Sequence, residues 1–177
     1  MKKRNFRELL EFILHRSSIR DFSGDRVDDE ILMNIVKAGM SAPTANNSQP
    51  WSFIIVSDRN IMLRLSEKLP YAKMLDMAGG AIVVCGIPDT KNPELKEYWV
   101  QDCSAATENI LLAAEAFGLG AVWTGVYPRT ERINWVKTVL GIPDDIIPLN
   151  VIPIGYPAKP PVIKNKFNAD KIRWNNW

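Results

Sequence analysis

The sequence is poor in the side chains that most often bind metals or act as nucleophiles, with one histidine and two cysteines among 177 residues. It has no GxSxG motif and no cluster with metal-ligand spacing. His15 is expected at a helix end, as a capping or packing residue. Cys85 and Cys103 fall in separate predicted elements, which favours two buried thiols in a reducing cytoplasm; a catalytic cysteine is the alternative and would need His15 as its base. The sequence therefore indicates neither a metal centre nor hydrolytic machinery.

Strong charge and long apolar runs are also absent. The formal net charge is +2 and the basic residues are scattered apart from Lys2, Lys3 and Arg4, which argues against a nucleic-acid surface. The longest apolar stretches are far shorter than a membrane span. No uninterrupted apolar run follows the basic start, so we predict no export signal and a cytoplasmic location. The length and the 46% hydrophobic content predict one domain over 1–177, with a C-terminal arm over about 157–177.

Hydrophobic periodicity and turn residues divide the chain into helices and strands. Phe6, Leu9, Leu10, Ile13 and Leu14 recur at helical spacing and predict a helix over 5–15 with one buried stripe. Further helices are predicted from a cap at Asp28 to Gly39 and over 58–69, 94–117 and 131–140, and strands over 51–57, 81–86, 121–126 and 150–156. Helices thus outnumber strands around a small Val- and Ile-rich sheet, for which mixed and parallel arrangements are both open.

Two segments predict contacts beyond a simple core. The second half of the helix over 94–117 is rich in alanine, which permits close approach of another helix, for example from a second subunit. The residues after Pro157 include Trp174 and Trp177, and burial of each indole would contribute roughly 2–3 kcal/mol. We therefore expect this tail to wrap over its own domain or over a partner.

Four side chains within 16–20 suit an anion. Arg16, Ser17, Ser18 and Arg20 combine charged donors with hydroxyls, the combination that binds phosphate. A helix C-terminal turn whose arginines offset the helix dipole is the alternative, and this segment taken alone slightly favours it. Lys164 and Lys166 would join such a site only if the tail folded back onto it.

A second polar segment lies between Pro43 and Pro50, directly before a predicted strand. It contains Asn46, Asn47 and Gln49, and a primary amide can read paired donor and acceptor edges of a heterocycle. An ordinary turn is the alternative, because Asn and Ser favour turns.

The glycines at 118–125 do not form a dinucleotide-binding fingerprint, because they follow a helix and precede a strand. Thr124 and Gly125 close that strand, where an exposed N–H can meet a ligand, although a simple turn is an equal alternative. Many hydrogen-bonding groups without an acid, base or nucleophile suggest that a cofactor does the chemistry.

The order of these motifs resembles the nitroreductase family of FMN-dependent oxidoreductases. The resemblance rests on Arg-Ser-Ser-Ile-Arg-Asp-Phe at 16–22, Ala-Pro-Thr-Ala-Asn-Asn-Ser-Gln-Pro-Trp at 42–51, Gly-Leu-Gly-Ala-Val-Trp-Thr-Gly at 118–125, and Gly-Tyr-Pro at 155–157 with a late Lys-Asn-Lys. It implies an α+β sandwich with a small mixed or antiparallel central sheet flanked by helices. It also implies a homodimer with FMN at the subunit interface and a C-terminal arm that crosses to the partner.

The resemblance further assigns roles to residues. Arg16, Ser18, Lys164 and Lys166 would hold the phosphate of FMN, and Arg20 would lie against the pyrimidine edge of the ring. The loop over 43–49 would come from the other subunit, and Thr124 and Gly125 would offer backbone N–H groups near the flavin N5 and O4. The implied cofactor-binding set is Arg16, Ser17, Ser18, Arg20, Pro43, Thr44, Ala45, Asn47, Gln49, Thr124, Gly125, Lys164 and Lys166. Many members of the family have a further flavin contact from the middle of the chain, and residues 71–76 are the candidate region for it here.

The activity that the resemblance implies is NAD(P)H-dependent reduction of nitroaromatics, quinones or similar electron-poor acceptors. Hydride would pass through flavin N5 in ping-pong fashion, with no catalytic side chain of the protein itself. Arg20 would raise the flavin potential by stabilising negative charge on the reduced ring. The alternative is a protein that stores or senses FMN without significant turnover.

Overall fold

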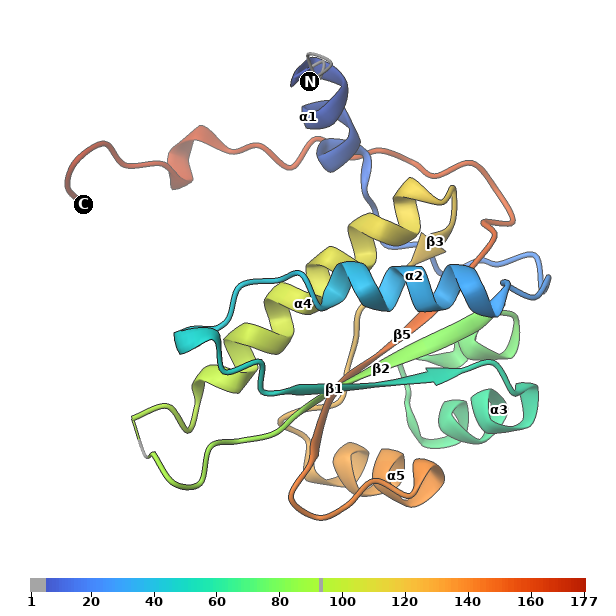
Figure 1. Ribbon diagram of the computed structural model, residues 1–177. Coiled ribbons are helices and arrows are strands. Elements are labelled where there is room, and N and C mark those ends of the chain that lie inside the picture. Colours follow the sequence, from blue (N-terminus) through green and yellow to red (C-terminus); the bar gives the residue numbers. More distant parts are fainter. Residues whose placement is uncertain (1–5, 93) are drawn as a thin grey trace.

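The computed structural model describes residues 6–92 and 94–177, which form helices around one sheet (Figure 1). The helices are α1 Phe6–His15, α2 Asp29–Gly39, α3 Arg59–Lys68, α4 Tyr98–Ala116 and α5 Thr130–Leu140, and the strands are β1 Trp51–Val56, β2 Gly80–Gly86, β3 Gly120–Ala121, β4 Thr124–Gly125 and β5 Ile147–Gly155. Short 3-10 turns lie at Ala45–Asn47, Lys73–Asp76 and Ala169–Lys171. The expected helices and strands are present, but α4 begins four residues later than predicted and β5 three residues earlier.

The sheet is antiparallel, with strand order β1-β2-β5-β3 and with β4 also paired to β5. This settles the direction of the strands, which the sequence left open. Helices were expected to outnumber strands, but the described residues contain five α-helices and five strands. The strand predicted over 121–126 is split into β3 and β4. The register places Pro153 of β5 opposite the break, and proline has no N–H to donate to a neighbouring strand.

The two faces of the sheet carry separate apolar clusters, which is why strand β2 is buried along its whole length. Ile82 and Val84 face the cluster beneath α2 and α4. Ala81, Val83 and Cys85 alternate with them and join the cluster on the side of α3 and α5. The result is the α+β sandwich that the sequence predicted (Figure 1).

The alanine-rich helix α4 is approached closely by a helix of its own chain. A Cβ added at Gly39, the last residue of α2, would lie 2.9 Å from Cγ1 of Ile110 and 3.5 Å from the carbonyl oxygen of Ala106. The absence of a side chain at Gly39 and the small one at Ala106 let α2 and α4 pack without a gap. The suggested second-subunit helix is not needed to explain this part of α4.

The apolar stripe of α1, which was predicted to be buried, is exposed in the single chain. Phe6 is 86% exposed and Leu14 60%, and none of the ten residues of α1 is buried. In Figure 1, α1 stands above the helices that pack on the sheet, apart from the body of the molecule.

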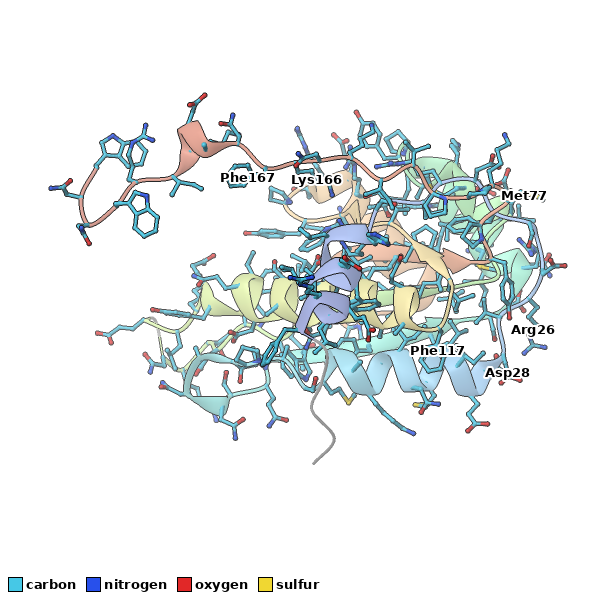
Figure 2. The ribbon with its side chains drawn as sticks, turned by 90° about the horizontal axis from the view of Figure 1, so that it is seen from above. Arg26, Asp28, Met77, Phe117, Lys166 and Phe167 are labelled. Atoms are coloured by element: carbon cyan, nitrogen blue, oxygen red, sulfur yellow. The ribbon has the colours of Figure 1, made fainter. Side chains whose placement is uncertain are left out.

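The C-terminal arm borders its own domain at first and then leaves it (Figure 2). It begins against residues 21–22, where the amide of Ala158 donates to the carbonyl of Asp21 at 2.9 Å. Beyond that point it runs outward past Lys166 and Phe167 (Figure 2), and Trp174 and Trp177 are 82% and 100% exposed. Its own domain therefore does not cover the two tryptophans, and burial of the tail against a partner stays a prediction.

Candidate functional site

Two adjoining cavities that share Arg20 bring separate sequence motifs together. The first, of about 360 Å³, is lined by Ser17, Ser18, Ile19, Arg20, Val162, Lys164 and Lys166. The second, of about 480 Å³, is lined by Arg20, Pro70, Tyr71, Lys73, Met74, Val122, Trp123, Thr124 and Gly125. The segment after α1, the late lysines and the pair at the end of β4 thus form one continuous region.

Local pairing with the sheet fixes the first cavity. Ser18 bridges to Ala121 of β3, and the amide of Ile19 donates to the carbonyl of Ala121 at 3.0 Å. This contact holds Ser17 in place, yet its Oγ is buried without a hydrogen-bond partner among the described residues. A buried hydroxyl left unpaired is unfavourable by about 1–3 kcal/mol, so an anion bound here would supply the missing partner.

The basic side chains around this cavity differ in whether they are free to bind an anion. Lys164 and Lys166 are exposed on the arm, and Nη1 of Arg20 makes only a long contact of 3.5 Å to the carbonyl oxygen of Ser18. Arg16 instead forms an ion pair with Glu108 of α4, with 3.2 Å between Nε and Oε1. It lines a neighbouring cavity of about 830 Å³ between α1 and the arm, which also contains both lysines. A phosphate contact by Arg16 stays a prediction.

The second cavity includes three residues from the region in which a mid-chain contact was sought. Tyr71, Lys73 and Met74 lie in the connection between α3 and β2 and reach the same cavity as Arg20. The ammonium of Lys73 already donates to the carbonyl of Ser66 at 2.8 Å. Tyr71 and Met74 are therefore the more available surfaces for a ligand.

The backbone at the end of β4 is fixed from both sides. The hydroxyl of Thr124 donates to the carbonyl of Val151, and Gly125 pairs with Asn150 of β5. On the other side, Nη1 of Arg132 donates to the carbonyl of Gly125 at 2.9 Å, and its guanidinium lies 5.3 Å from the Tyr71 ring centroid. Arg132 is not among the predicted site residues, because a basic residue on α5 carries no local signal for this contact.

Trp123 was also missed as a lining residue, although it lies inside the glycine-rich motif that drew attention to Thr124. Its side chain is 37% exposed and borders the second cavity. Trp123 lies in the break between β3 and β4, so the alternation of side chains along a strand does not predict its orientation.

The loop over 43–49 lines neither of the two cavities. Ala45 and Ser48 instead border a small cavity of about 30 Å³ beside Asp102 of α4. The predicted origin of this loop in the other subunit remains a prediction, because only one chain is described.

The two thiols are buried and poorly reactive. Burial is the main cause that raises the pKa of Cys85 and of Cys103 to about 12, so both are protonated at neutral pH. The Cys103 thiol points to backbone carbonyls, 3.7 Å from that of Cys85. These observations favour the prediction of buried thiols over that of a catalytic cysteine, and the described residues hold no metal-binding cluster.

The chain has an α+β fold with cavities suited to an anion, and comparisons with known proteins identify its family. The chain matches the nitroreductase family over residues 13–83 and 65–156. It is 45% identical to an Archaeoglobus fulgidus protein named "Putative NADH dehydrogenase/NAD(P)H nitroreductase", covering 96% of this chain and 99% of that protein. The chain therefore belongs to the nitroreductase family, and the predicted enzyme class, an oxidoreductase, is confirmed.

Similar solved structures support the same family assignment. A protein of the same name from Parabacteroides distasonis is 48% identical, with a TM-score of 0.89 over 96% of this chain and 99% of that chain. The NADPH:FMN oxidoreductase of Vibrio harveyi, solved in complex with NAD+, is 27% identical, with a TM-score of 0.82 over 95% of this chain and 77% of that chain. No helix among the described residues is long and apolar enough to cross a membrane, and the cytoplasmic location stays a prediction.

Proposed function

We propose that this protein is an FMN-dependent oxidoreductase that takes electrons from NADH or NADPH and reduces nitroaromatics, quinones or similar electron-poor acceptors. The observation that carries the proposal is the pair of adjoining cavities joined at Arg20. One offers hydroxyls and cations, which suit a phosphate; the other offers aromatic surface and backbone groups, which suit a flat heterocycle. FMN has this division between its two ends.

The residues fit the cofactor at the phosphate end. The unpartnered hydroxyl of Ser17, the hydroxyl of Ser18 and the ammonium groups of Lys164 and Lys166 would hold the phosphate. Arg20 lines both cavities and would carry positive charge from the phosphate end to the ring end. Its guanidinium makes no ion pair among the described salt bridges, so its charge is available to a ligand.

When bound, FMN would supply hydride transfer through its N5, in alternating reactions with NAD(P)H and the acceptor. The chain's own contribution is to bind and to orient. Arg20 would stabilise the negative charge that accompanies reduction, and the backbone of Thr124 and Gly125, fixed by Val151 and Arg132, would offer rigid hydrogen-bonding groups. No side chain of the protein needs to act as acid, base or nucleophile.

We further infer that the working unit is a homodimer. The exposed apolar face of α1 and the exposed aromatic residues of the arm form a surface that a lone soluble chain would leave against water. A second copy would cover both, with the arm crossing to the partner and the 43–49 loop completing the partner's flavin site.

The visible spectrum of the purified protein tests the proposal directly. We expect a yellow protein that is bleached within seconds, on the order of ordinary enzyme turnover, when mixed anaerobically with NADH or NADPH. The alternative, a protein that stores or senses FMN, predicts a bound flavin that stays oxidised with both donors. A colourless protein that takes up no added FMN would contradict both functions.

Mixed dimers test the shared site. One variant, Asn47→Ala with Gln49→Ala, disables the loop; the other, Ser17→Ala with Lys164→Ala, disables the phosphate end. If the two halves come from different subunits, exchange of subunits creates sites with both halves intact, and FMN uptake appears that neither variant shows alone. Uptake that does not recover after confirmed subunit exchange would place both halves in the same chain.

A further inference from the structure

A buried carboxylate on α4 holds the 43–49 loop by its backbone. Asp102 is 5% exposed, and its Oδ1 accepts a hydrogen bond from the amide of Ala45 at 3.1 Å, across 57 residues of sequence. Its Oδ2 is buried without a partner among the described residues. An ionisable side chain is seldom buried in this way without a specific task, because removing it from water is unfavourable.

The loop that Asp102 holds has a strained backbone. Asn46, Asn47 and Gln49 have φ values of 52°, 52° and 48°, in the left-handed region that non-glycine residues rarely adopt. Within the loop, the amide of Gln49 donates to Oγ1 of Thr44 at 3.2 Å, and Nε2 of Gln49 donates to Oδ1 of Asn47 at 3.1 Å. These local bonds orient the amide side chains, and a strained segment of this kind persists only where surrounding structure fixes it.

A second polar residue on α4 holds the other end of the same connection. Nδ2 of Asn109 lies 3.2 Å from the carbonyl oxygen of Ala38 and 3.4 Å from Oγ of Ser41. Residues 102 and 109 are seven positions apart, about two helical turns, and so lie on one face of α4. That face therefore fixes the connection both where it leaves α2 and where it enters the strained loop.

We propose that Asp102 is a positioning residue for the cofactor-binding loop: its hydrogen bond to Ala45 keeps Asn47 and Gln49 in the conformation that receives FMN. This inference rests on the proposed function. Without the anchor, the loop would relax from its left-handed conformation, and binding would have to restore the order that the free protein lacks. Since the loop is inferred to complete the partner's site, the anchor would act on the cofactor of the other subunit.

The test uses the whole protein and compares two substitutions of Asp102 with a control substitution on the same helix. Asp102→Asn keeps an oxygen that accepts from the Ala45 amide, whereas Asp102→Ala removes it. Thr107→Ala serves as the control, since Thr107 is buried on α4 and bonds to Asn150 and to the carbonyl of Cys103 without touching the loop. The readouts are the Kd for FMN and, in the cofactor-free protein, the hydrogen-exchange rate of the Ala45 amide.

We expect Asp102→Ala to weaken FMN binding about tenfold and to speed exchange at Ala45 similarly, because the hydrogen bond that holds the loop is lost. Asp102→Asn should restore most of the FMN affinity and most of the protection of the Ala45 amide. Thr107→Ala should reduce thermal stability while leaving the Kd for FMN and the exchange rate at Ala45 unchanged. The inference is overturned if Asp102→Ala leaves the Kd unchanged, or if Asp102→Asn is as impaired as Asp102→Ala. Wild-type protein that binds no FMN would instead contradict the proposed function, and the exchange rate at Ala45 would still test the anchor.

Discussion

Replacing Arg20 by alanine should lower the reduction potential of the bound flavin more than it weakens flavin binding. Arg20 lines both the cavity suited to a phosphate and the cavity suited to the ring. Reduction adds negative charge to the ring system, so a fixed cation beside it stabilises the reduced state more than the oxidised state. Lys164 and Lys166 line only the first cavity and should act on binding instead, while Lys73 of the second cavity donates to the carbonyl of Ser66.

The size of the shift follows from how the guanidinium is held. Its only described hydrogen bond within the chain is the long 3.5 Å contact to Ser18, and its side chain is exposed to solvent in the single chain. A hydrogen bond to a charged group contributes about 1.5–3 kcal/mol, and solvent exposure favours the lower end of that range. For a two-electron couple about 1.4 kcal/mol corresponds to about 30 mV, so we expect a decrease of about 30 mV.

The assay is an anaerobic titration of the reconstituted protein against a redox dye of known potential. Arg20→Lys, which retains the charge, should recover part of the shift. Arg26→Ala is the matched control, because Arg26 is an exposed arginine paired with Asp29 at 2.8 Å and borders neither cavity. An unchanged potential in Arg20→Ala, or an equal change in Arg26→Ala, would refute the reasoning.

Two further predictions concern the arm and the thiols. Replacing Lys164 and Lys166 together by alanine should raise the Kd for FMN about tenfold and flatten its salt dependence, whereas Lys171→Ala should do neither; fluorescence titration at two ionic strengths decides this. The stability of the folded protein should fall above about pH 9, because unfolding lowers the raised pKa of Cys85 and Cys103 from about 12 to 9.0 and the unfolded chain then releases protons that the folded chain keeps. At pH 10 the decrease in the free energy of unfolding is about 1.4 kcal/mol per thiol. Urea unfolding at pH 8 and pH 10 should therefore show a clearly smaller pH effect in a variant with both cysteines changed to alanine. An equal pH effect in that variant would mean that the thiols do not titrate as inferred.

Elements with local signals were predictable from the sequence. Asp28 was read as a helix cap, and its carboxylate accepts from the amide of Glu30 at 2.7 Å. The short apolar run of β2 indicated a strand covered on both faces, as observed. These features depend on residues close in sequence, so propensity and periodicity are sufficient to find them.

Strand pairing was less predictable because it depends on distant partners. The sequence over 121–126 has the composition of one strand, but its continuity is interrupted opposite Pro153, about thirty residues later in the chain. Strand direction was left open for the same reason, since connection lengths alone do not fix it.

The site shows the same division between local and distant information. The anion-suited segment at 16–20 was predicted from its composition and the late lysines from the family resemblance, and the fold brings residues 17–20 and both lysines to one cavity. Arg132 and Asp102 were not found, because each acts on backbone atoms of another segment, Gly125 and Ala45 respectively. A side chain whose partner is a distant backbone group leaves no pattern in the sequence around it.

Flavin binding and subunit association should be energetically linked in this protein. The arm that carries Lys164 and Lys166 lines the first cavity and then continues outward with its tryptophans exposed, so one segment serves both the anion site and the surface inferred to meet a partner. If a second copy orders the arm, it also orders the two lysines, and FMN then binds to a site that is already assembled. By reciprocity, FMN must strengthen the dimer by the factor by which the dimer strengthens FMN binding. If the functional unit is a homodimer, the exposed apolar stripe of α1 and the absence of the 43–49 loop from the two cavities are two consequences of one arrangement.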